Sequence, residues 1–129
     1  MRRLLTTCYT ERTLRIISGR WKILILWLLF DEVLRFSELA RSLREVTDLA
    51  ITKRMLTQQL RELEEDGLVV RKVYPQVPPK VEYSLTPLGK NLRRVLDAMD
   101  EWGQLHDATL KESSRRVASG TAPGRASLI

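Results

Sequence analysis

Cysteine and histidine are nearly missing from this chain of 129 residues, which contains one of each, Cys8 and His106. A single cysteine excludes an intramolecular disulfide and a cysteine metal cluster. A histidine-based metal site or a Ser-His-Asp triad would depend on His106 alone, which has no suitable neighbours in sequence. We therefore expect no metal and no cofactor. A small enzyme is a weak interpretation, because a glycine-rich phosphate loop is missing as well.

Long apolar runs are also missing. The longest run, ILILWLLF at residues 23–30, is far shorter than the ~20 residues that span a bilayer. The N-terminal sequence MRRLLTTCYTERTL is basic, but its apolar stretch is too short for a signal peptide. We expect neither a membrane partner nor an export signal, and therefore a cytoplasmic protein.

Positive charge is in excess. The chain has 22 Lys and Arg against 16 Asp and Glu, a net charge of +6 and a pI of about 9.9. This balance favours association with nucleic acid or with an anionic membrane surface. Charge alone is equally compatible with a merely soluble basic protein. Hydrophobic residues make up 43% of the chain, which is enough for the small core of one domain.

Apolar periodicity and β-branched runs predict the order of the elements. We expect helices at 11–18, 20–30 and 37–46, a short strand at 34–36, a helix at 52–66, strands at 68–74 and 81–86, and a helix from Pro87 to about Leu110. The loop PQVPPK between the two strands is stiff and open, because proline cannot continue a ladder. Residues 111–129 are small, polar and basic, which is typical of a disordered tail.

Local start and stop signals support these helices. Ser37 is the expected N-cap of the third helix, and Thr52 is a good N-cap for the fourth, with Asp48 as a rival. Gly67 is expected to close the fourth helix in a left-handed conformation. Thr86 followed by Pro87 is a further helix start.

This order of elements predicts a mainly α fold with a small β-wing, the winged helix-turn-helix, because a set of helices is followed by a two-stranded ribbon. In that fold the helix before the ribbon enters the DNA major groove, and the ribbon tip reaches the flanking backbone or minor groove. We assign residues 1–110 to a DNA-binding and dimerisation domain and residues 111–129 to the tail.

The helix at 52–66 has its charges in the order that a helix dipole disfavours. Its leading part holds Lys53, Arg54 and Arg61 without an acid, and residues 62–66 hold four acids without a base. At about 100° per residue, leucines 56, 60 and 63 fall on the core side.

The opposite side of this helix holds Arg54, Gln58 and Arg61, with Thr57 on its flank. Arginine can bond guanine, and glutamine can bond adenine, through two hydrogen bonds each. Threonine and lysine suit phosphate or thymine methyl groups. The alternative is an ordinary solvated face, which would mix the two signs of charge along its whole length.

The ribbon contributes Arg71, Lys72 and Lys80. Alternation points some of them outward, but the register does not follow from the sequence. A basic edge that blocks aggregation is a competing explanation for these residues.

An apolar seam runs along the C-terminal helix. Leu92, Val95, Met99 and Trp102 recur at spacings of three and four residues. The seam is too long to be covered by so small a domain, so a partner helix should cover it in a homodimer.

The stretches MLTQQLRELEEDGLVVRKVYPQVPPKVEYSLTPLGKNL, ERTLRIISGRWKILIL and RFSEL resemble the HxlR-type winged-helix transcriptional regulators, over about residues 8–106. The resemblance implies a bacterial dimeric repressor or activator that dimerises through its first and last helices. It implies that the helix after Thr52 and the proline-rich wing bind double-stranded DNA. By this resemblance, the residues that contact DNA are Lys53, Arg54, Thr57, Gln58 and Lys80.

One segment departs from the family pattern. REVTDLA, residues 44–50, stands where family members have a short proline-glycine turn. It is either an insertion that changes the angle of the recognition helix or an extra turn of the preceding helix.

The family also resembles redox and electrophile sensors that use an N-terminal cysteine, and Cys8 stands in the position of that cysteine, followed by Tyr9 where proline is frequent. This implies an oxidant or small-molecule effector. A helix N-terminus and Arg12 nearby can both lower a thiol pKa. The alternative is that Cys8 is a small buried apolar residue beside the dimer helices.

These observations favour a homodimeric, sequence-specific transcriptional regulator on a roughly palindromic operator. The competing interpretation is a winged helix used for protein–protein assembly. It predicts an apolar recognition face, and Arg54, Gln58 and Arg61 argue against it.

Overall fold

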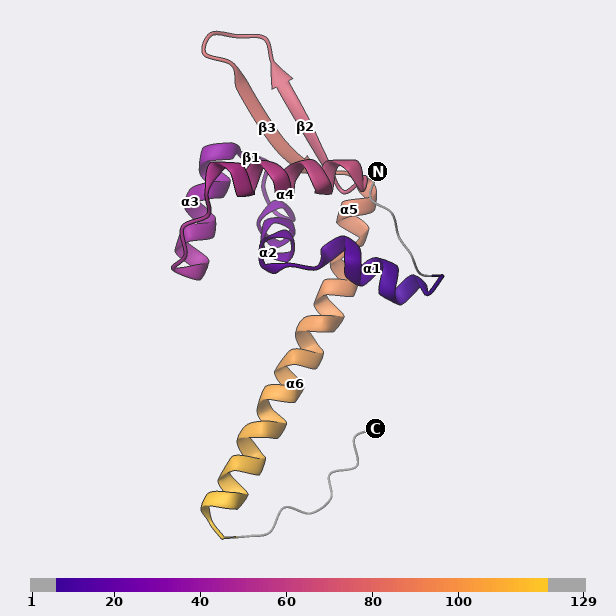
Figure 1. Ribbon diagram of the computed structural model, residues 1–129, viewed down its shortest axis with the longest axis vertical. Coiled ribbons are helices and arrows are strands. Elements are labelled where there is room, and N and C mark those ends of the chain that lie inside the picture. Colours follow the sequence, from indigo (N-terminus) through magenta and orange to yellow (C-terminus); the bar gives the residue numbers. More distant parts are fainter. Residues whose placement is uncertain (1–6, 121–129) are drawn as a thin grey trace. The chain divides into compact units, whose positions relative to one another are not determined.

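The computed structural model describes residues 7–120. They belong to two compact units, Met1–Arg93 and Arg94–Ile129. The elements are α1 (Tyr9–Ile17), α2 (Arg20–Leu29), β1 (Leu34–Arg35), α3 (Phe36–Thr47), α4 (Lys53–Glu65), β2 (Val69–Tyr74), β3 (Lys80–Leu85), α5 (Pro87–Asn91) and α6 (Arg93–Ala118). The predicted order of helices and strands is confirmed (Figure 1). None of the helices within residues 7–120 has the length and apolar character needed to cross a bilayer.

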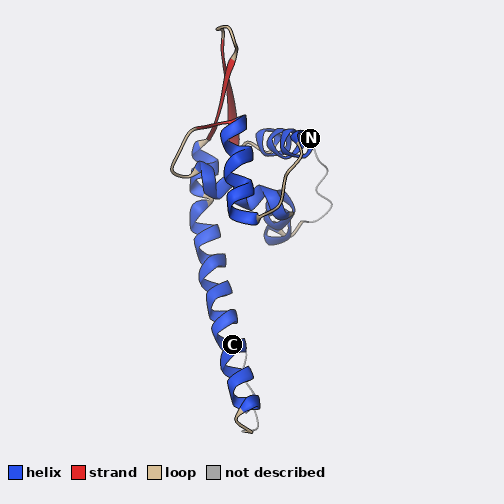
Figure 2. Cartoon of the chain, turned by 90° about the vertical axis from the view of Figure 1, so that its left-hand side faces the viewer, coloured by secondary structure: helices blue, strands red, loops and turns tan. Residues whose placement is uncertain are grey.

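A three-stranded antiparallel sheet with the order β1-β3-β2 forms the wing and its base. The β2–β3 hairpin extends away from α3 and α4 as a twisted ribbon (Figures 1 and 2). Its register pairs Val69 with Leu85 and Arg71 with Tyr83. Because directly opposed residues share a face, the buried Val69, Tyr83 and Leu85 lie on one face of the ribbon, the inner face, together with the exposed Arg71.

The core of the first unit lies between α2, α3, α4 and the base of the sheet. Its helical members are Ile25, Leu26, Leu29, Leu39, Leu43, Leu56, Leu60 and Leu63, and all of them are buried. Each such side chain contributes roughly 1.5–3 kcal/mol when it is fully buried. The predicted core side of the fourth helix is therefore confirmed.

Both ends of α4 are fixed by local signals. The Thr52 hydroxyl accepts a hydrogen bond from the Met55 N–H at 3.1 Å. Gly67 has a φ of 77°, and the Leu68 N–H donates to the Leu63 carbonyl at 2.9 Å. This 6→1 bond across a left-handed residue is a Schellman ending. The predicted Thr52 cap and Gly67 stop are confirmed.

The predicted helix start at Thr86 and Pro87 is also confirmed, but two predicted caps are wrong. Asp48 does not start α4 but ends α3, with a φ of 58° and its N–H bonded to the Arg44 carbonyl. Ser37 lies inside the first turn of α3, because the Glu38 carboxylate accepts from the Arg35 N–H at 3.0 Å and so starts the helix earlier. The segment 44–50 is largely an extra turn of α3, which runs to Thr47.

The predicted C-terminal helix differs in two ways. It is divided at Leu92 into α5 and α6, and α6 continues to Ala118 rather than ending near Leu110. The predicted boundary of the tail at residue 111 is therefore wrong. Ion pairs one turn apart, Lys111–Asp107 at 2.9 Å and Arg116–Glu112 at 3.5 Å, support the added turns. Residues 121–129 of the predicted tail lie outside the described residues.

A close approach of backbones joins α5 to the turn after α4. The Thr86 hydroxyl donates to the Gly67 carbonyl at 2.6 Å and accepts from the Gly89 N–H at 3.0 Å. A Cβ atom at Gly89 would lie 2.3 Å from the Leu68 carbonyl oxygen. Only glycine permits this packing, which ties the first turn of α5 to the base of the wing.

Candidate nucleic-acid interface

The outer face of α4 presents a basic and amide-rich surface. Arg54, Gln58 and Arg61 are exposed on the side of the helix opposite the buried leucines. Lys53 is exposed at the leading end, and Glu65 is exposed at the other end. The predicted orientation of α4 is therefore confirmed, and its positive charge lies toward the N-terminal part.

Thr57 is half-buried beside this face, and its hydroxyl already has a partner. The hydroxyl donates to the Lys53 carbonyl at 2.7 Å. With its proton used inside the helix, the side chain offers a methyl group and an acceptor rather than a donor. Thr57 therefore suits a thymine methyl group better than a phosphate.

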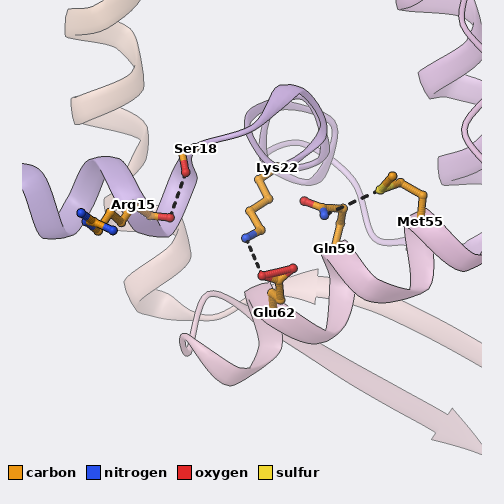
Figure 3. A network of polar contacts seen from close by, with 6 residues as sticks. All are labelled: Arg15, Ser18, Lys22, Met55, Gln59 and Glu62. Carbon is orange, nitrogen blue, oxygen red and sulfur yellow. Dashed lines mark hydrogen bonds and ion pairs between the residues drawn. The ribbon is translucent and has the colours of Figure 1, made fainter. Parts of the chain in front are cut away.

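The flank of α4 that carries Met55, Gln59 and Glu62 lies toward α2 (Figure 3). From α2, Lys22 donates to a Glu62 carboxylate oxygen at 3.2 Å, and the Lys22 side chain is 4% exposed against 21% for Glu62. On the same flank, the Gln59 amide approaches the Met55 sulfur at 3.9 Å. A partly buried ion pair thus connects α2 with the recognition helix. Lys22 is absent from the predicted functional residues.

We expect the two halves of this ion pair to contribute unequally to stability. Glu62→Gln leaves the buried Lys22 ammonium without an opposite charge, and should cost about 3 kcal/mol. Lys22→Met leaves Glu62, which can be hydrated, and should cost only about 1 kcal/mol. Urea denaturation of both variants measures the difference. The double variant should be more stable than Glu62→Gln alone, and a larger loss for Lys22→Met would contradict the assignment.

The basic residues of the wing, Arg71, Lys72 and Lys80, are divided between the two faces of the ribbon. Arg71 pairs with Tyr83 on the inner face, whereas Lys72 pairs with Glu82 and Lys80 pairs with Tyr74 on the outer face. The ammonium groups of Lys72 and Lys80 each lie 4.9 Å from the centre of the Tyr74 ring. Lys80 also approaches Glu82 at 3.9 Å. The ribbon therefore presents two lysines on one face and an arginine on the other.

A shallow basic concavity joins the start of α4 to the tip of the wing. Lys53 and Lys80, both predicted, border it together. Arg35 and Arg44 border it as well, and neither was among the predicted contacts. The sequence could have indicated Arg35 and Arg44 as DNA contacts, because they lie before and within α3, and the first helix of a helix-turn-helix crosses the DNA backbone.

Cys8 is exposed and precedes the first residue of α1. Hydrogen bonds from the backbone N–H of Glu11 and then of Thr10 lower the pKa of its thiol, with a smaller contribution from the Thr10 hydroxyl. The predicted effect of the helix start is thus present. Arg12, also predicted to lower this pKa, instead lies over the Tyr9 ring at 5.3 Å. Within the single chain, Cys8 is not the buried apolar residue of the alternative interpretation.

The second half of the predicted apolar seam is exposed within the single chain. Met99 is 42% exposed and Trp102 is 64% exposed. The Trp102 ring stacks on His106, with 5.2 Å between ring centres. Leu92, at the junction of α5 and α6, and Val95 are half-buried. An indole with this much exposed apolar surface is unusual on a helix unless a partner covers it.

A helix with a basic, amide-rich outer face, placed before a basic β-ribbon, defines a winged-helix DNA-binding protein. Comparison with known proteins refines this class. The model of the HxlR-like helix-turn-helix family matches residues 16–111. The chain belongs to this family of transcriptional regulators, as the resemblance predicts.

Relatives and solved structures agree with this placement. The chain is 46% identical over 110 residues to an uncharacterized HTH-type transcriptional regulator of Methanothermobacter thermautotrophicus, covering 85% of this chain and 80% of the relative. It is similar to the reduced form of the redox regulator HypR, with a TM-score of 0.69 and 45% identity over 81% of this chain and 99% of that chain. It is also similar to the reduced form of the transcriptional regulator YodB from B. subtilis, with a TM-score of 0.65 and 34% identity over 75% and 91%.

Proposed function

We propose that the protein acts in the cytoplasm as a homodimer that binds a roughly palindromic DNA operator. Each α4 enters the major groove by its N-terminal end, and the two half-sites lie about one helical turn of DNA apart. The observation that supports this most strongly is the outer face of α4, where Arg54, Gln58 and Arg61 are exposed and the acids lie at the far end. On this face the far-end acid is Glu65, which stays away from the phosphates when the N-terminal end leads.

Each proposed contact has a chemical role. Arg54 suits the two acceptors of guanine, and Gln58 suits the donor and acceptor of adenine. Lys53 and Lys80 border one concavity and suit the phosphates of the flanking strand. Lys72 adds charge on the same face of the wing as Lys80.

The proposed dimer uses the first and last helices. The Met99 and Trp102 side chains on α6 are exposed within one chain, as are Tyr9 and Leu14 on α1. A two-fold dimer would cover the same apolar surfaces on both subunits. It would also place two copies of α4 at the fixed spacing that a palindrome requires.

Selection of binding sites from a random DNA pool tests this proposal. We expect the enriched sites to contain an inverted repeat whose half-sites have centres about 10 base pairs apart. A guanine or adenine preference within each half-site would fit Arg54 and Gln58. A pool that shows no enriched sequence after several rounds would contradict sequence-specific binding.

We further propose that Cys8 responds to oxidants or electrophiles. The similarity to HypR, a redox regulator, supports this, as do the exposure of the thiol and its lowered pKa. Two thiolates can be oxidised to one disulfide while the oxidant takes up two electrons. With one cysteine in the chain, the second sulfur must come from the other subunit or from a small thiol. A bond or adduct at that position would change the angle between subunits and therefore the spacing of the two α4 helices.

We expect diamide to change operator affinity in the wild-type protein and not in Cys8→Ser. The reaction rate of Cys8 with iodoacetamide should follow the thiolate fraction, because the thiolate is the nucleophile. Since the thiol pKa is lowered in the fold, the rate should rise at a lower pH in the native protein than in the urea-unfolded chain. Equal responses of both proteins to diamide, or none in either, would assign Cys8 a packing role.

A further inference from the structure

A second concavity lies between α4 and the inner face of the wing. It adjoins the one that contains Lys53 and Lys80, because Phe36 borders both. The lining residues are Phe36, Thr57, Leu60, Arg61, Glu64, Arg71 and Tyr83. Leu60 and Tyr83 are buried and give it a fixed apolar base. Charged groups come from two elements, Arg61 and Glu64 from α4 and Arg71 from β2.

Both arginines of this concavity are available to a ligand. Neither Arg61 nor Arg71 takes part in an ion pair or side-chain hydrogen bond among residues 7–120. The backbone of Arg71 is fixed by strand pairing, because its partner Tyr83 is buried and also pairs with Leu34 on its other side. Two guanidinium groups facing one hollow form a binding site for an anion with several oxygens, because each can donate two parallel hydrogen bonds.

The path of DNA through the proposed complex supplies such an anion. When α4 lies in the major groove and the wing tip reaches the flanking backbone or minor groove, one strand must cross between α4 and the wing. The second concavity lies in that gap. We propose that it holds a single phosphate of this strand between Arg61 and Arg71. This inference depends on the proposed function, since it assumes that α4 docks in the groove.

Glu64 gives the site a second testable property. Its carboxylate borders the same concavity as the two arginines and repels a phosphate there. Glu64 therefore weakens DNA binding without affecting which sequence is bound, because a phosphate contact has no direct sequence information. Glu64→Gln should raise the affinity for operator and random DNA by the same factor.

The decisive experiment measures the salt dependence of DNA binding for Arg61→Gln, Arg71→Gln and the double variant. Each neutralised phosphate contributes about 0.9 to the slope of log K against log salt. If both arginines hold one phosphate, the double variant should lose about 0.9 of slope. Between 50 and 200 mM salt, the affinity of the double variant should therefore fall by a factor about 3.5-fold smaller than that of the wild type. The ratio of operator to random affinity should stay at the wild-type value.

Lys111→Gln is the matched control, because it also removes one exposed positive charge, from α6 rather than from the concavity. It should leave the slope unchanged. A slope loss of about 1.8 in the double variant would show two separate phosphates and overturn the shared site. Unchanged slopes in all variants would overturn the site altogether. If Arg71→Gln lowered the ratio of operator affinity to random-DNA affinity, Arg71 would contact a base instead of a phosphate. Failure of the proposed function is distinct, since wild-type protein would then show no operator preference.

Discussion

Trp102→Glu is expected to convert the dimer into monomers and to lower operator affinity by at least about 100-fold. Trp102 is 64% exposed in the single chain, so the proposed interface would bury two copies of it. Each large apolar side chain contributes roughly 1.5–3 kcal/mol on burial, and the substitution places a carboxylate there instead. Loss of the second subunit removes the avidity of two linked half-site contacts, which is typically worth about 10²–10⁴.

Sedimentation velocity measures the mass, and circular dichroism shows whether the variant is still folded. Gln104→Glu is a suitable control, because it adds the same charge to α6 at an exposed position outside the Leu92, Val95, Met99 and Trp102 seam. We expect Gln104→Glu to remain dimeric. A folded Trp102→Glu protein with the mass of a stable dimer would refute the role of the seam.

Arg54→Ala and Gln58→Ala should each reduce discrimination between operator and random DNA without unfolding the domain. A good bidentate base contact is worth about 1–3 kcal/mol of discrimination, so each variant should lose roughly 5- to 150-fold. Both side chains are exposed, and substitutions at such positions usually change stability by less than about 0.5 kcal/mol. Gel-shift titration against operator and random DNA at one salt concentration measures the ratio.

Glu65→Ala serves as the comparison on the same helix. Glu65 is exposed on the same side of α4 as Arg54, but lies at the end that should remain outside the groove. Its removal should leave the ratio unchanged. Wild-type discrimination in both Arg54→Ala and Gln58→Ala would remove these residues from base recognition.

The recognition helix could be predicted from the sequence because its signals are local. The Thr52 side chain caps α4 through the N–H of Met55, only three residues further along the chain. Gly67 adopts the left-handed conformation that its position after the helix requires. The orientation of the helix followed from the spacing of the leucines alone. The sequence pattern ends the C-terminal helix too early, because side-chain pairs such as Arg116 with Glu112 extend the helix through a polar segment that resembles a tail.

Features that depend on distant pairing could not be predicted. Lys22 lies in an apolar helix, and the reason for its burial is Glu62, 40 residues further along the chain. The face on which Arg71 lies depends on its pairing with Tyr83 across the ribbon, and alternation alone does not fix that register. The sequence leaves Asp48 as a rival N-cap for α4, because its side chain suits that position, but the residue also tolerates the left-handed conformation that ends α3.

Footprinting on the DNA upstream of the protein's own gene, with and without oxidant, tests most directly that this protein is a sequence-specific regulator. Without oxidant, we expect two protected segments with centres about one helical turn apart, and their loss in the Arg54→Ala/Gln58→Ala double variant. Oxidant should change the protein concentration at which the wild-type protein protects these DNA segments. It should not change the concentration that Cys8→Ser requires. Uniform protection along the fragment, or none at concentrations that bind any DNA, would contradict sequence-specific binding by α4.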